Sequence, residues 1–283
     1  MIDISSWTGL DDIRNGLSDD YQLTRSLLTT DGDYAGIGDD WSPIFAFAGS
    51  LDGKGFIIDG LTIVGSTGYG WALIAETDAG ASVALSNLGL TNVDISGNNS
   101  AAALVGNMWD GTITNCYATG SVSGADQVGG LIGAVAGSSV VVSDCYANVN
   151  VTNAEGGTGL GGFVGEADGG EIKNCYSVGT VSNPFENSYV GGFAGINYGT
   201  VTNCGWWSAS GPTNAIAEPV SSITYAEADK TAFYDKTHNV YDGAVPYWDF
   251  VTPIWVENGS DFPTLYAPAS FRTKSPFPMF RRA

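Results

Sequence analysis

One short phrase of the sequence returns at a nearly constant interval. NCYATG at Asn115 is followed by DCYANV at Asp144, NCYSVG at Asn174 and NCGWWS at Asn203. The four cysteines of the chain are therefore separated by 29, 30 and 29 residues. A fixed period of this length is typical of a solenoid, in which each repeat buries its apolar side only against its neighbours. The period thus predicts a stack of equivalent coils.

A second, glycine-rich phrase keeps the same interval. ALVG ends at Gly106, GGLIG at Gly133, GGFVG at Gly165 and GGFAG at Gly195. Val, Ile, Thr and aromatic residues fill short segments between these phrases, while Gly, Asn and Ser separate the segments, which indicates three strands per coil. We therefore predict an all-β fold, a single parallel β-helix. Right-handed winding is expected because nearly all parallel crossovers have that hand.

The cysteine column has two interpretations, a chemical site made of thiols or a structural repeat. Zinc sites use close Cys pairs together with His, whereas this chain has no close pair and only His238. One coil earlier the equivalent position holds Leu88 after Asn87, and Leu cannot replace a thiol ligand. We therefore predict reduced, buried cysteines with a structural role and no metal. They are Cys116, Cys145, Cys175 and Cys204.

The residue before each of these positions is expected to form a bend between two strands. Asn and Asp tolerate unusual backbone angles, and their side chains can bond to neighbouring main-chain groups. Because stacked coils bring equivalent residues about 4.8 Å apart, the amides can form a ladder. The predicted ladder residues are Asn87, Asn115, Asp144, Asn174 and Asn203.

Two pairs of segments carry a resemblance to a known repeat. Gly129 to Gly133 with Asp144 to Ala147, and Gly161 to Gly165 with Asn174 to Ser177, resemble the GLUG motif. With the flanking segments, the resemblance covers about residues 5–268. It implies a β-helical protein of the kind found on bacterial surfaces and in adhesins. GLUG repeats also lie beside the catalytic domain of a zinc peptidase that cleaves immunoglobulin A, but the H-E-x-x-H motif of that enzyme is absent here.

The chain divides into four parts by pattern. We predict an N-terminal cap with leading strands over 1–40, the β-helix over 41–210, an irregular aromatic closing segment over 211–270 and a basic, aromatic docking tail over 271–283. In the cap, Leu10, Ile13 and Leu17 have helical spacing behind Ser5 or Ser6, either of which can cap the helix.

Charge narrows the range of partners. The chain holds 10 basic and 30 acidic residues, a net charge of −20, which argues against nucleic acid as a partner because phosphate contacts need Lys and Arg. The acid excess favours solubility and suits salty surroundings, where self-repulsion is screened. No apolar run is long enough to span a membrane, and the first residues lack a signal-peptide pattern.

An acidic stretch, TTDGDYAGIGDDW, supplies the only candidate metal ligands. Hard cations such as calcium prefer several carboxylate oxygens, but the Glu that closes an EF-hand loop is missing. The alternative is an acidic turn that leaves the cap. The candidate ligands are Asp31, Asp33, Asp39 and Asp40.

Tyr117, Tyr146 and Tyr176 directly follow three of the cysteines. Alternation along a strand predicts that they point outward, where exposed rings could stack on a sugar or on a partner surface. The alternative is that stacked rings stabilise neighbouring coils.

The sequence contains no clear set of catalytic residues. Metallopeptidase, papain-like and Ser-His-Asp mechanisms need a histidine, and only His238 is present. Carbohydrate-cleaving β-helices use clustered carboxylates, yet few acidic residues here recur in register. We therefore predict no catalytic residue, no cofactor and no enzymatic activity.

Three function classes remain. We predict the first, a non-enzymatic virion structural protein such as a phage capsid decoration, spike or tail component. The alternatives are a secreted bacterial adhesin or surface stalk fragment and a glycan-active β-helix enzyme. The tail is expected to bind other virion or surface proteins, or a second copy in a homo-oligomer, and a glycan receptor is a further candidate partner. The predicted tail contacts are Arg272, Lys274, Phe277, Phe280, Arg281 and Arg282.

Overall fold

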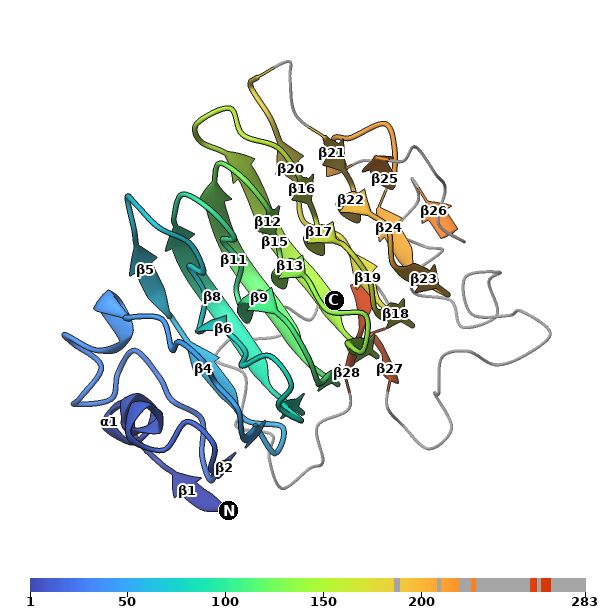
Figure 1. Ribbon diagram of the computed structural model, residues 1–283. Helices are drawn as coiled ribbons and strands as arrows, with labels where there is room; N and C mark the ends of the chain where they lie inside the picture. Colours follow the sequence, from blue (N-terminus) through green and yellow to red (C-terminus); the bar gives the residue numbers. More distant parts are fainter. Residues whose placement is uncertain (186–188, 208–209, 219–224, 228–254, 259–260, 266–283) are drawn as a thin grey trace, which may run out of the picture.

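A computed structural model describes residues 1–185, 189–207, 210–218, 225–227, 255–258 and 261–265. The chain winds as a parallel β-solenoid, with its coils stacked in sequence order from the N-terminal end (Figure 1). The predicted all-β, parallel architecture is confirmed.

One coil illustrates how the sequence phrases become strands. β10 (Thr112–Thr114) leads through the bend at Asn115 into the long strand β11 (Tyr117–Gly124). β12 (Val128–Gly129) and β13 (Ile132–Val135) carry the glycine-rich phrase, after which β14 opens the next coil. This coil therefore contributes one strand to each of three main faces and one short additional strand.

The first face is an eight-stranded sheet. In spatial order it contains β1 (Ile2–Ile4), β2 (Asp20–Leu23), β3 (Ser50–Asp52), β7 (Ala84–Ser86), β10, β14 (Val141–Ser143), β18 (Glu171–Lys173) and β23 (Thr200–Thr202). The second face is formed by β4 (Ile57–Asp59) and β5 (Thr62–Val64), both beside β8 (Gly89–Ser96), then β11, β15 (Tyr146–Asn153), β19 (Tyr176–Ser177) with β20 (Val181–Ser182), β24 (Gly205–Trp207) and β26 (Tyr225–Glu227).

The third face is a six-stranded sheet, and a three-stranded sheet lies at the remaining corner. The third face contains β6 (Ile74–Glu76), β9 (Val105–Met108), β13, β17 (Val164–Ala167), β22 (Ala194–Asn197) and β25 (Ile216–Glu218). The corner sheet contains β12, β16 (Leu160–Gly161) and β21 (Val190–Gly191). An antiparallel pair, β27 (Trp255–Asn258) with β28 (Asp261–Leu265), belongs to the closing segment.

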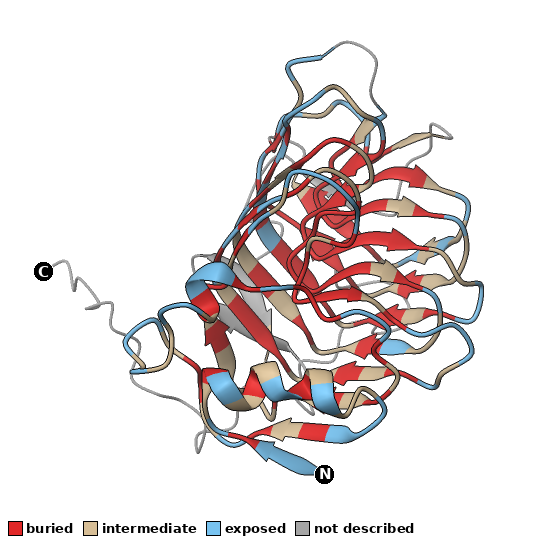
Figure 2. Cartoon of the chain, turned by 60° about the vertical axis from the view of Figure 1, so that its left-hand side comes forward, coloured by how far each residue is buried: buried red, intermediate tan, exposed pale blue. Residues whose placement is uncertain are grey.

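Register keeps equivalent apolar residues above one another. Along the first face, the central residue of each strand from β2 to β18 is buried, and the inside of the solenoid is a continuous apolar core (Figure 2). Each such aliphatic side chain contributes about 1.5–3 kcal/mol by leaving water. The column is Tyr21, Leu51, Leu85, Ile113, Val142 and Ile172, and it continues to the half-buried Val201.

A short helix forms behind Ser6 and contains Leu10, and Ile13 lies in the 3-10 turn that follows, but the predicted third position, Leu17, lies beyond both. α1 (Trp7–Asp11) begins after Ser6, whose hydroxyl accepts from the Gly9 N–H at 3.0 Å, and the 3-10 helix η1 (Asp12–Asn15) ends at Gly16. Parallel pairing starts earlier than residue 41, because β1 pairs with β2, and β2 with β3. These leading strands lack the Asn-Cys and Gly-Gly phrases, so the repeat pattern does not reveal them.

Candidate functional site

The five predicted bend residues share one backbone conformation. Their φ angles are 53° at Asn87, 53° at Asn115, 56° at Asp144, 53° at Asn174 and 51° at Asn203. Only the left-handed region has such angles, and it costs most L-residues roughly 1–2 kcal/mol, whereas Asn and Asp visit it readily. This local preference explains why the repeat keeps Asn or Asp before each Cys.

The side chains of these bends form a hydrogen-bonded ladder in two segments. Asn115 Nδ2 donates to Asn87 Oδ1 at 3.1 Å, and Asn87 Nδ2 donates to Asp52 Oδ1 at 3.0 Å. In the second segment, each amide again donates to the coil before it. Asn203 Nδ2 lies 3.4 Å from Asn174 Oδ1, and Asn174 Nδ2 lies 3.2 Å from Asp144 Oδ1.

Asp52 begins the first segment, although it lies outside the repeated Asn-Cys phrase. Burial works to raise the pKa of Asp52, but hydrogen bonds from Lys54 and Asn87 outweigh it and lower that pKa. The second segment likewise begins at an aspartate. A carboxylate has no proton to donate, so Asp144 cannot continue the ladder to Asn115, and the interruption between them follows from its chemistry.

The four cysteines lie in the core directly after these bends. All four are fully buried free thiols, and each Sγ contacts the carbonyl oxygen two residues earlier. Burial raises the pKa of Cys116 and Cys175 well above the ordinary thiol value, which keeps these thiols protonated. The Sγ–O distances are 3.3 Å for Cys116, 3.1 Å for Cys145, 3.1 Å for Cys175 and 3.2 Å for Cys204.

The three tyrosines stack, but they do not form an exposed surface. The ring centroids of Tyr117 and Tyr146 are 4.8 Å apart at 9°, and those of Tyr146 and Tyr176 are 5.0 Å apart at 2°. Tyr146 is 7% exposed and Tyr176 only 1%, so the expected contact surface is wrong for these two residues. Strand alternation predicts the side of the strand on which a side chain lies, but not what packs against it there. Tyrosine rings in successive coils cover one another's faces. Tyr117 is partly buried, and that burial raises its pKa.

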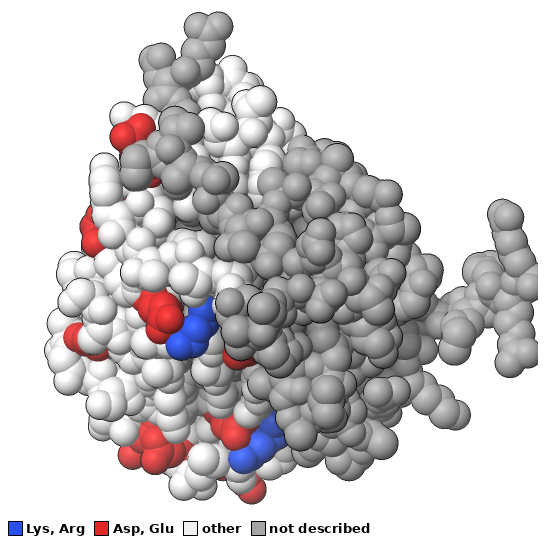
Figure 3. All heavy atoms as spheres, turned by 90° about the vertical axis from the view of Figure 1, so that its right-hand side faces the viewer, with Lys and Arg blue, Asp and Glu red and all other residues white. Residues whose placement is uncertain are grey.

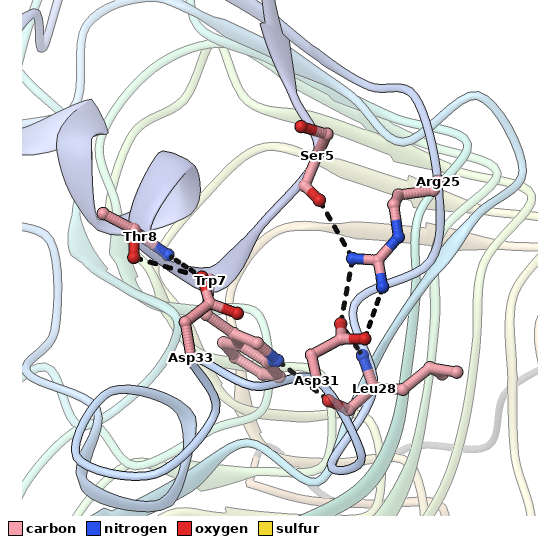
Figure 4. A network of polar contacts seen from close by, with 7 residues as sticks. All are labelled: Ser5, Trp7, Thr8, Arg25, Leu28, Asp31 and Asp33. Carbon is pink, nitrogen blue, oxygen red and sulfur yellow. Dashed lines mark hydrogen bonds and ion pairs between the residues drawn. The ribbon is translucent and has the colours of Figure 1, made fainter.

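The four aspartates near the cap do not converge on a cation site. Arg25 forms an ion pair with Asp31, which also accepts from Leu28 N at 2.9 Å (Figure 4). Asp33 accepts from the backbone N–H and the hydroxyl of Thr8, at 2.9 and 3.1 Å, and these hydrogen bonds lower its pKa. Asp39 accepts from Gly36 N, and Asp40 is exposed.

The contact between Asp33 and Thr8 fastens the acidic loop to α1, and Trp7 Nε1 of the same helix donates to Leu28 O at 3.1 Å (Figure 4). Within the described residues, no group of three or more His, Cys, Asp or Glu could hold a metal ion. The geometry therefore favours the alternative that the sequence left open, an acidic turn.

Acidic side chains greatly outnumber basic ones in the coils. Residues 1–185 hold 21 acidic and 4 basic residues, a net charge of −17. Every basic residue in the described part of the chain pairs with a carboxylate. On the face shown in Figure 3, acidic side chains are scattered over a mostly uncharged surface. The pairs are Arg14–Asp11, Arg25–Asp31, Lys54–Asp52 and Lys173–Glu171.

Sequence reasoning missed a polar network at the corner of the glycine-rich phrase. Ser100 Oγ lies 2.9 Å from Gln127 Oε1 and 3.0 Å from Asn107 Oδ1. Gln127 Nε2 donates to Glu166 Oε2 at 2.8 Å, while burial and the nearby Asp168 raise the pKa of Glu166. Ser100 and Gln127 occupy one equivalent position of their coils, and Asn107 and Glu166 occupy another. The residue type changes from coil to coil at both positions, so no repeated phrase marks them.

The remaining candidates lie outside the described residues. They are His238 and the tail residues Arg272, Lys274, Phe277, Phe280, Arg281 and Arg282. No helix among the described residues is long and apolar enough to cross a membrane.

The fold and its ladders define the class of protein, a parallel β-solenoid with an asparagine–cysteine column. Its repeats match the GLUG motif at residues 97–123 and 156–182, so the chain carries GLUG repeats, as the sequence phrases predicted.

Two further comparisons concern individual proteins. A stretch of 133 residues, 45% of this chain, is 37% identical to halomucin from Haloquadratum walsbyi, of which it spans only 1%. The crystal structure of a provisionally assigned immunoglobulin A1 protease from Bacteroides ovatus superposes with a TM-score of 0.65 at 19% identity. That superposition covers 93% of this chain and 91% of the other, and at this identity it shows a shared fold alone.

Proposed function

We propose that this chain is a non-enzymatic, structural β-solenoid module of a protein exposed at a cell surface or released from the cell. The observation that carries the proposal is the local similarity to halomucin, which is 37% identical over 133 residues. Asparagine, cysteine and tyrosine columns account for the most regular positions of the repeat, and each has partners within the column.

The charge distribution supports the same proposal. Every described cation is already paired, so the excess carboxylates repel one another across the surface unless dissolved salt screens them. A module with this surface is well suited to a salty medium outside the cell.

A proteolytic role is not part of the proposal, because the likeness to the Bacteroides ovatus protein extends to the fold alone. The sequence has a single histidine and no H-E-x-x-H motif. We expect no cleavage when the full chain is incubated with immunoglobulin A1. Cleavage that a metal chelator abolishes would refute the non-enzymatic assignment.

Location is the direct test. Antibodies against the folded chain should label intact, unpermeabilised cells of the producing organism or detect the protein in its medium. Label on purified virus particles would establish the narrower expectation of a virion component. Label that appears only after permeabilisation, with none in the medium or on particles, would overturn the proposal.

A further inference from the structure

We propose that Asn150 is a site of N-linked glycosylation, an inference that rests on the surface or secreted location proposed above. Asn150-Val151-Thr152 has the acceptor pattern N-x-S/T. The pattern alone is a weak signal, because the sequence also contains Asn98-Asn99-Ser100 and Asn258-Gly259-Ser260. The motifs at Asn150 and Asn98 have different environments in the fold. Ser260 and the side chain of Asn258 lie outside the described residues.

The amide of Asn150 is held in an orientation that leaves its nitrogen open. Asn150 is exposed on β15, where its Oδ1 accepts from Thr180 Oγ1 at 2.7 Å and from Thr180 N at 3.2 Å. Both contacts use the oxygen, and among the described residues Nδ2 makes no hydrogen bond. Thr152, two residues further on, is exposed on the same face of the strand. Acceptor amide and motif hydroxyl are therefore both accessible.

The surroundings of Asn150 leave room for a sugar chain. Its neighbour in the preceding coil is Ser121, and Thr152 lies between Ser123 and Ser182 in the register. These side chains are all small and polar, and Ser121, Thr180 and Ser182 are exposed. A glycan at this position displaces no core residue.

The motif at Asn98 has the opposite environment. Asn98 Nδ2 donates to Glu155 Oε2 at 2.9 Å, so a sugar on this nitrogen competes with an existing contact. Ser100 is 1% exposed, and its hydroxyl lies within the network with Gln127 and Asn107. A glycan at Asn98 is therefore poorly compatible with the folded coil.

The reaction is a group transfer without redox change. Asn150 Nδ2 forms a bond to the anomeric carbon of an oligosaccharide, and the bond from that carbon to a lipid-linked pyrophosphate breaks. The pyrophosphate leaves, and the amide nitrogen loses one proton. The donor is thus a lipid-linked oligosaccharide pyrophosphate, used by a transferase of the export route.

The test places the full chain behind a cleavable export leader in a cell that performs N-glycosylation. Protein from the medium is treated with a peptide N-glycosidase, which converts glycosylated Asn to Asp, and peptide mass spectrometry locates the change. We expect modification at Asn150 in the wild type and in Thr152→Ser, which keeps the motif. We expect loss of the modified peptide in Thr152→Ala and Asn150→Gln, with thermal unfolding close to that of the wild type.

Secreted, folded wild-type protein that is unmodified at Asn150, or modified at Asn98 instead, overturns the site. Protein isolated from the outside of its own producer must also carry the modification, and an unmodified Asn150 there overturns the proposal equally. Neither result affects the proposed location, because export is imposed in the first arm and labelling measures location independently.

Discussion

Replacing Asn174 with Leu tests the physical account of the bend most directly. The residue sits at φ 53°, donates to Asp144 at 3.2 Å and accepts from Asn203 at 3.4 Å. Leu would lose both side-chain hydrogen bonds, each contributing about 0.5–1.5 kcal/mol. It would also occupy the left-handed region at a cost of roughly 1–2 kcal/mol.

Because Asn174 is half-buried and its contacts are long, the hydrogen bonds fall at the lower end of their range. We therefore expect Asn174→Leu to lower the free energy of unfolding by about 2–3 kcal/mol. Asn174→Gly separates the two causes, since glycine accepts this φ without strain and loses only the hydrogen bonds. Its expected cost is about 1–2 kcal/mol, which includes the greater freedom of glycine in the unfolded chain.

The measurement is urea denaturation followed by circular dichroism. The slope of the unfolding free energy against urea concentration must be the same in all variants, because solenoids can depart from two-state unfolding. Asn148→Leu is the matched control: Asn148 is exposed in β15 and has no left-handed φ, so we expect its effect to stay within about 0.5 kcal/mol. If Asn174→Leu leaves the free energy of unfolding unchanged, or if Asn174→Gly lowers it as much as Asn174→Leu does, the strain argument is refuted.

Three other outcomes follow from the structure, and a fourth follows from the sequence of the tail. The fully buried cysteines should react with a thiol reagent only on unfolding, and absence of free thiols in the denatured protein would contradict their structural role. Raising salt from about 0.1 to 1 M shortens the Debye length from about 10 to 3 Å and should raise the melting temperature; a decrease would contradict the repulsion argument. Asp52 has a pKa below its ordinary 3.8, so its stabilisation is present above that pH and is lost as pH falls through the lower folded value. Asp52→Asn should therefore flatten the acid limb of a stability–pH curve, and an unchanged limb would contradict this assignment. Deleting residues 271–283 should abolish binding of the chain to its partner protein or to a second copy, with little change in melting temperature. A truncated chain that still binds either partner would exclude the docking role.

The columns were predictable because they are periodic and local. Asn before Cys, at intervals of 29 or 30 residues, indicates both the left-handed bend and the inward residue that follows it. The substitution of Leu88 for Cys indicated a buried apolar position, and both residue types are fully buried in the structure. Local backbone preference and packing act together here, which is why sequence alone sufficed.

Burial of the tyrosines and the fate of the acidic loop were harder to predict. Alternation gives the side of the strand on which Tyr176 lies, but its exposure depends on what covers that side. Similarly, carboxylate spacing suggested that Asp31 and Asp33 could share a cation, whereas their partners are Arg25 and Thr8. These contacts join segments that are distant in sequence and do not repeat, so no periodic pattern encodes them.

The contrast between repeated and singular positions also indicates where this solenoid carries its own function. A residue that recurs in every coil is accounted for by stacking, as the asparagine bends are. Asn150 is different: its equivalents in neighbouring coils are Ser121 and Thr180, neither of which offers an amide. Stacking therefore does not require an asparagine at this position, although the fold exposes it together with Thr152. A polar residue that is exposed, oriented and unique to one coil is better explained by chemistry at the surface than by the stability of the stack.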